Sequence, residues 1–144
     1  HLDDTLYRDL YEARRVIEGC IARLAAVRIT EAELRVIKEN IAQAAGSLDD
    51  PAAFYRSDLE LHKLILVASG NRVVPAFMQS INKVQLMMRQ RTNLRLKIRK
   101  AAIDDHRLIF KALAAHDPDA AGEAMERHIA HVEAVFFNEK EEAQ

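Results

Sequence analysis

Cysteine, glycine and proline are scarce in this sequence. The single cysteine, Cys20, excludes an internal disulfide and any zinc site built on several thiolates, and it favours a cytoplasmic location. Only four glycines and three prolines occur in 144 residues. Tight turns must therefore be few, and the composition favours long helices.

A surplus of charge and long apolar runs are also missing. The 21 basic and 22 acidic residues leave a net charge of -1, which argues against binding nucleic acid by bulk electrostatics. No uncharged apolar run reaches the roughly 20 residues that a membrane-spanning helix needs, so we expect no membrane partner. The 49% hydrophobic and 30% charged residues are typical of one soluble globular domain over residues 1–144.

Apolar residues recur at three- and four-residue steps, the spacing of amphipathic helices. In the first helix the predicted buried stripe is Leu6, Leu10, Ala13, Ile17, Ile21 and Leu24. Thr30 with Glu33 forms a capping box, and the pairs Asp50-Pro51 and Asp117-Pro118 each combine an N-cap with a first-turn proline. The pattern predicts helices over 4–27, 31–45, 51–68, about 71–92, about 100–115 and from 118, with a break between Thr92 and Lys100. The predicted fold is an all-α antiparallel bundle of six helices, with seven as the alternative count.

Four potential metal ligands occur at suggestive positions. Asp58 and His62 are one helical turn apart, and His106 and His128 each lie 11 residues from Asp117. An antiparallel hairpin bent at Asp117 places the last two imidazoles at about the same height, within otherwise apolar stripes. Three inward histidines and one inward aspartate favour a divalent metal over isolated, hydrogen-bonded core histidines.

The ligand types suit Zn²⁺ or Ni²⁺, with Mn²⁺ and Fe²⁺ as alternatives. A six-coordinate ion would keep two positions for water or for a small organic acid, which favours a ligand sensor. A small metal-dependent hydrolase is the alternative, because a three-histidine site with open positions can activate water. That alternative lacks a general base, since no HExxH motif occurs and Asp58 would be occupied as a ligand.

Three further residues are candidates for contact with a ligand. Arg14 either pairs at the surface with a neighbouring glutamate or projects inward to clamp a carboxylate. Met87 could line a pocket, although methionine at helical spacing is usually core filling. Arg89 opens the dense basic run at 89–100, which is either a solvated helix end or a contact for DNA or for a missing domain, with one arginine turned inward as a further reading.

Several segments together resemble a known family. They are the stretch 11–18 (YEARRVIE), the stretch 54–62 with Asp58 and His62, the stretch 68–71 (ASGN), the pair Asp105-His106 and the stretch 125–128 (MERH). In this order they are similar to the FCD domain, the C-terminal effector domain of FadR-subfamily GntR transcription regulators. The likeness covers about residues 6–137, and the six-helix count resembles the shorter, VanR-like branch.

The resemblance implies a bundle that holds a divalent metal through Asp58, His62, His106 and His128, beside a pocket for a small organic acid. It also implies that Arg14 meets the effector's carboxylate, and that the domain senses a ligand without turning it over. Family members carry a winged helix-turn-helix domain before this one. The chain opens at His1 without a second core, so we expect a fragment whose DNA contacts lie in that missing domain, and which acts as a homodimer.

Overall fold

The computed structural model describes residues 4–80, 82, 86 and 95–142, and these residues form helices and short connections without a strand. The helices are α1 (Asp4–Arg28), α2 (Glu31–Ala45), α3 (Pro51–Ala68), α5 (Leu96–Ala114) and α6 (Pro118–Glu142), with a further helical stretch over 74–80. The all-α fold predicted from the sequence is therefore confirmed.

Capping contacts fix where the helices begin. Thr30 and Glu33 exchange both hydrogen bonds of a capping box, in which each side chain accepts from the backbone amide of the other residue. The carboxylates of Asp50 and Asp117 each accept a hydrogen bond from the amide three residues further on. These bonds satisfy first-turn amides that have no partner within the helix, and they explain why the predicted starts of α2, α3 and α6 are correct.

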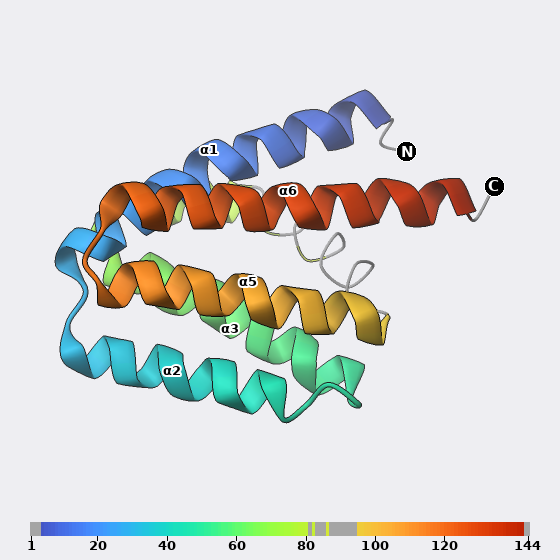
Figure 1. Ribbon diagram of the computed structural model, residues 1–144. Helices are drawn as coiled ribbons and strands as arrows, with labels where there is room; N and C mark the ends of the chain where they lie inside the picture. Colours follow the sequence, from blue (N-terminus) through green and yellow to red (C-terminus); the bar gives the residue numbers. More distant parts are fainter. Residues whose placement is uncertain (1–3, 81, 83–85, 87–94, 143–144) are drawn as a thin grey trace.

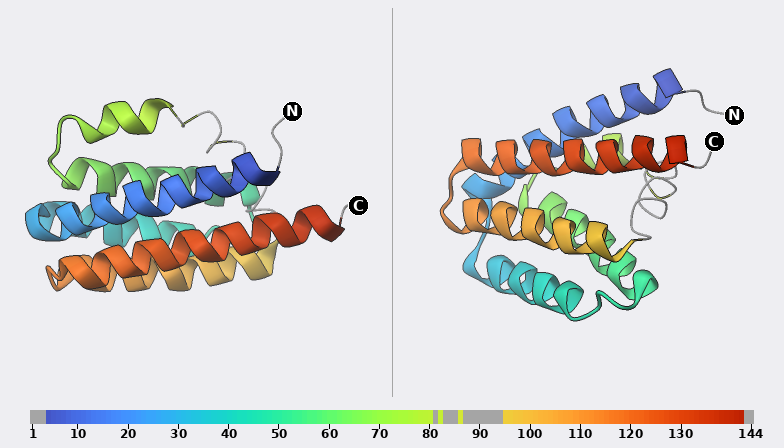
Figure 2. Two further views of the ribbon diagram at one scale, coloured as in Figure 1. Left: turned by 90° about the horizontal axis from the view of Figure 1, so that it is seen from above. Right: turned by 45° about the vertical axis from the view of Figure 1, so that its right-hand side comes forward.

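Helices α1 and α2, α2 and α3, and α5 and α6 run antiparallel, whereas α3 and α5 run in the same direction (Figure 1). Helices α1 and α6 lie side by side and share the most extensive packing, while α5 packs between α6 and α2. The two further views show the same arrangement, with α3 beside both α1 and α2 (Figure 2). Helices α3, α5 and α6 thus present inward faces to one another, although they are distant in sequence.

Two glycines allow α1 and α6 to approach closely. A β-carbon at Gly122 would lie 2.2 Å from the guanidinium carbon of Arg23, and one at Gly19 would lie 2.7 Å from Oε1 of Glu126. Arg23 and Glu126 use that space to form a 2.8 Å ion pair between the two helices. This contact fixes α6 against the middle of α1.

The buried face of α1 differs from the predicted stripe. Leu6 is 41% exposed, whereas Arg14 and Glu18 are buried. The buried residues of α1 are Tyr11, Arg14, Glu18, Gly19, Ile21, Ala22, Ala25 and Ala26. The predicted stripe is confirmed at Ile21, which is buried, and Leu10 and Ile17 pack against the core. The prediction was wrong at Leu6, and it missed the buried ion pair that occupies two positions of the core face.

The break expected between Thr92 and Lys100 falls partly on described residues, from Arg95 onward. Helix α5 begins at Leu96, after an extended Arg95 with φ −100° and ψ 139°, so a helix does start within the expected interval. Residues 87–94 lie outside the described part of the chain. Among the described helices, none is both long enough and apolar enough to cross a bilayer.

Candidate metal centre

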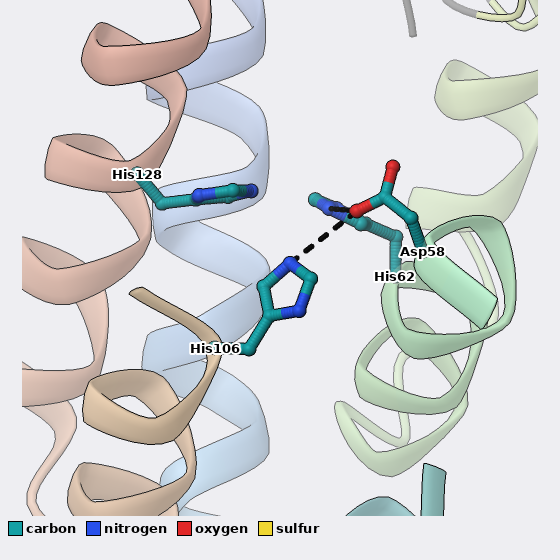
Figure 3. A group of neighbouring side chains, drawn as sticks. All are labelled: Asp58, His62, His106 and His128. Atoms are coloured by element: carbon teal, nitrogen blue, oxygen red, sulfur yellow. Dashed lines mark ion pairs between the residues drawn. The ribbon is translucent and has the colours of Figure 1, made fainter. Parts of the chain in front are cut away.

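Asp58 and His62 of α3, His106 of α5 and His128 of α6 point into one space between the helices (Figure 3). One ligand atom from each of the four residues lies within 4.8 Å of the others. The side chains of all four are at least nine-tenths buried. Helices α3, α5 and α6 thus bring together the four residues that the sequence analysis identified as potential ligands.

The distances suit a single ion. Oδ1 of Asp58 lies 3.3 Å from Nε2 of His106 and 3.6 Å from Nε2 of His62. Nitrogen and oxygen ligands about 2.1 Å from one metal are about 3 to 4 Å apart, so only a small closure separates the arrangement from a coordination shell. The rings of His106 and His128 are 5.0 Å apart, which confirms that the α5–α6 hairpin places them level.

His106 provides the test of whether a metal fits. Its side chain is 1% exposed, and among the described residues neither ring nitrogen has a partner in hydrogen-bond geometry. Leaving a buried polar atom without a partner costs about 1–3 kcal/mol. A metal at Nε2 would remove part of that cost, so the donor set fits a divalent cation.

His128 is held from behind by a carboxylate. Its Nδ1 lies 3.0 Å from Oδ2 of Asp105, and Nδ1 of His131 lies 3.0 Å from the same carboxylate. Burial raises the pKa of the Asp105 carboxyl. The hydrogen bonds from His128 and His131 together lower this pKa by more, so its net shift is downward. Burial lowers the pKa of His128 to about 4 against the opposing hydrogen bond from Asp105. At neutral pH the imidazole of His128 is therefore neutral, with Nδ1–H on Asp105 and the Nε2 lone pair left for a metal.

His62 has the same kind of support from α1. Oε1 of Glu18 lies 2.5 Å from Nδ1 of His62, and Oε2 of Glu18 accepts a 2.9 Å hydrogen bond from Nε of Arg14. Arg14, Glu18 and His62 thus form a buried chain that ends at the cluster. Carboxylates in this position fix the tautomer of a histidine ligand and raise its basicity.

The sequence prediction missed the roles of Glu18 and Asp105. Neither carboxylate was predicted to support a metal-binding histidine. The i,i+4 spacing of Arg14 and Glu18 carries the signal for their pairing. The structure also places the side chain of His131, which is 51% exposed, beside Asp105.

The three candidate ligand contacts fare differently. Arg14 projects inward, and its Nη1 is buried with no hydrogen-bond partner among the described residues. Its Nε is engaged by Glu18, so its contact with an effector remains a prediction. Met87 and Arg89 lie outside the described residues.

A cavity of about 560 Å³ adjoins the cluster. Its wall includes Glu18 and His62, and the rest comes from α1, α3, α6 and the residues Pro75, Ala76, Met78, Gln79, Asn82 and Leu86. This volume lies within the range of pockets that hold small ligands. A molecule in the cavity would therefore lie directly against one ligand of the candidate metal centre.

The fold and the cluster together define a helical domain with an internal site suited to a divalent cation. A model of the FCD domain family matches residues 9–131 of the chain. The chain belongs to the FCD domain family, which confirms the resemblance seen in the sequence.

Solved structures with similar folds include GntR of Streptococcus agalactiae, with a TM-score of 0.76 and 28% identity over 92% of this chain and 61% of that one. The metal-free FCD domain of TM0439 matches over 96% of both chains, with a TM-score of 0.78 and 24% identity. The second likeness shows a shared fold.

Curated relatives are transcription regulators. The HTH-type transcriptional repressor NanR of Edwardsiella tarda (strain FL6-60) is 29% identical over 82% of this chain and 46% of NanR. The HTH-type transcriptional regulator LutR of Bacillus subtilis (strain 168) is 28% identical over 94% of this chain and 64% of LutR. The chain spans about half the length of most of the relatives it matches.

Proposed function

We propose that this chain is the ligand-sensing domain of a GntR-type transcription regulator. In this proposal Asp58, His62, His106 and His128 hold a divalent metal, and the metal takes the carboxylate of a small organic acid. Occupancy would shift the bundle and so alter DNA binding by a preceding helix-turn-helix domain in a homodimer. Membership of the FCD family and the regulator names of the relatives support the regulatory role.

The observation that carries the metal assignment is the burial of His106 without a hydrogen-bond partner among the described residues, facing three other donors. A core built only for stability would pair both ring nitrogens or replace the histidine with an apolar residue. Three imidazoles and one carboxylate favour Zn²⁺ or Ni²⁺, with Mn²⁺ and Fe²⁺ as weaker candidates.

The surroundings of the cluster favour binding over turnover. The carboxylates of Glu18 and Asp105 are each engaged by a histidine, and Glu18 is also engaged by Arg14. A hydrolase would need a carboxylate or imidazole able to take a proton from a metal-bound water. We therefore place this domain among sensors, acting in the cytoplasm where operator DNA lies.

Metal content of purified variants tests the proposal. Protein prepared without chelator or nickel resin should carry one divalent ion per chain by mass spectrometry, and His106→Ala should lose most of it. His116→Asn is the matched control, because it removes an exposed histidine outside the cluster at a position with φ +51°, which asparagine tolerates. Equal metal content in wild type and His106→Ala would refute the assignment.

A further inference from the structure

The cavity beside the cluster has two unlike ends. Glu18 and His62 stand at its inner end, where both side chains are less than one-tenth exposed. Lys63, Gln79 and Asn82 also line the cavity, and all three are exposed residues. A ligand would therefore enter past these polar side chains and meet the candidate metal centre at the far end.

Between these ends the walls are apolar. The buried side chains of Ile21, Ile65, Met78 and Met125 form the inner walls. Leu59 and Leu66, both half-buried on α3, continue this surface toward the mouth. Aliphatic and thioether side chains favour the burial of an apolar ligand surface against them, and they offer no hydrogen bonds to hydroxyl groups.

The polar groups at the inner end are already engaged. Glu18 accepts a hydrogen bond from Arg14 and contacts His62, so its carboxylate is committed on both oxygens. A polyhydroxylated ligand would have to bury several hydroxyl groups along the walls without partners, which is unfavourable. A ligand with one polar head and an apolar body matches each part of the cavity.

We infer that the effector is a carboxylic acid with an aliphatic or aromatic body rather than a polyhydroxylated sugar acid. This inference rests on the proposed function, because the acid's head group is taken by the metal. Its body lies along Ile21, Leu59, Ile65, Leu66 and Met125, and its far end reaches Lys63.

Two acids with the same head and chain length separate the alternatives. Gluconate and 2-hydroxyhexanoate are both six-carbon 2-hydroxy acids, so their chelating groups are the same, but gluconate carries four more hydroxyls. With zinc-loaded protein, calorimetry should show 2-hydroxyhexanoate binding at least tenfold more tightly. Lengthening the chain from 2-hydroxybutyrate to 2-hydroxyoctanoate should tighten binding by up to about fourfold for each buried methylene.

A pair of leucines on α3 provides matched variants. Leu66 lines the cavity, whereas Leu64 does not, and both are half-buried residues packed against the same core. Leu66→Gln should weaken 2-hydroxyoctanoate binding at least fivefold, while Leu64→Gln should change it less than twofold. Zinc content should be unchanged in both variants.

The outcomes separate this inference from the proposed function. Two results would overturn the inference and leave metal-based sensing standing. One is zinc-loaded protein that binds gluconate as tightly as 2-hydroxyhexanoate, and the other is an equal loss of 2-hydroxyoctanoate affinity in Leu66→Gln and Leu64→Gln. Protein that takes up no divalent metal would overturn the proposed function, and this inference with it.

Discussion

At the scale of single residues, two carboxylates determine how the cluster is presented. Glu18 holds Nδ1 of His62, and Asp105 holds Nδ1 of His128. Each contact turns the Nε2 edge of an imidazole toward the common space. Loss of such a supporting group typically weakens metal binding by about 10- to 100-fold.

Replacing Asp105 should therefore weaken metal binding without removing a ligand. We expect Asp105→Asn to raise the dissociation constant for Zn²⁺ by about 10- to 100-fold, measured by competition with a chromophoric chelator. Asp104→Asn is the control, since the neighbouring Asp104 carboxylate is 77% exposed and faces Arg107. If the two variants bind zinc equally well, Asp105 does not orient the site.

Burial of His128 predicts a pH dependence for the metal-free protein. The folded pKa of about 4 is below the ordinary value of 6.5, so between these values the unfolded chain binds a proton that the folded chain does not. The free energy of unfolding should thus fall as the pH drops through this window, by about 3 kcal/mol, because 2.5 pKa units at 1.36 kcal/mol each are at stake.

Urea denaturation of chelator-treated protein between pH 4 and 7 measures this effect. His128→Gln should flatten the dependence, with His116→Asn as the control that removes an exposed histidine. A wild-type protein equally stable at both ends of the range would show that His128 is not buried in neutral form.

The site was predictable from sequence where spacing alone placed the side chains. The one-turn spacing of Asp58 and His62 and the equal distances of His106 and His128 from Asp117 placed the members of each pair together, and the expected inward position of both pairs placed all four in one interior. The contacts between Glu18 and His62 and between Asp105 and His131 depend on how helices cross and rotate. Periodicity along one helix does not contain that information.

At the scale of the helices, capping explains why most boundaries could be predicted. The starts of α2, α3 and α6 follow from local contacts three residues apart, which a sequence displays directly. The core face of α1 was predicted only in part, because Arg14 and Glu18 neutralise each other inside the bundle and both lie on it. Apolar periodicity assigns such residues to the surface.

The capping box of α2 gives a prediction at this scale. Thr30→Ala should lower the free energy of unfolding by about 1 kcal/mol, because the Glu33 amide loses its acceptor. Thr30→Ser retains the hydroxyl group and should stay within about 0.5 kcal/mol of wild type. Urea denaturation at neutral pH compares the three proteins, and an equal loss in both variants would mean that the hydroxyl does not cap the helix.

At the scale of the whole molecule, the cluster joins helices that are far apart in sequence. A metal bound by α3, α5 and α6 would link the middle of the chain to its two C-terminal helices. Any ligand that binds only the folded state stabilises it, by about 2.7 kcal/mol at 100 times the dissociation constant.

Zinc should therefore raise the melting temperature of chelator-treated protein by roughly 8 °C at that concentration, since a domain of this size gains about 3 °C per kcal/mol. The shift should vanish in His106→Ala and persist in His116→Asn. Differential scanning calorimetry gives the measurement, and an identical zinc-induced shift in His106→Ala would place the ion elsewhere.

Diffraction from crystals of the zinc-loaded protein at the zinc absorption edge tests the central claim most directly. The account predicts one anomalous peak about 2.0 to 2.2 Å from a carboxylate oxygen of Asp58 and from Nε2 of His62, His106 and His128. A zinc-loaded crystal with no peak among these four side chains, or with its peak at another group of residues, would contradict it.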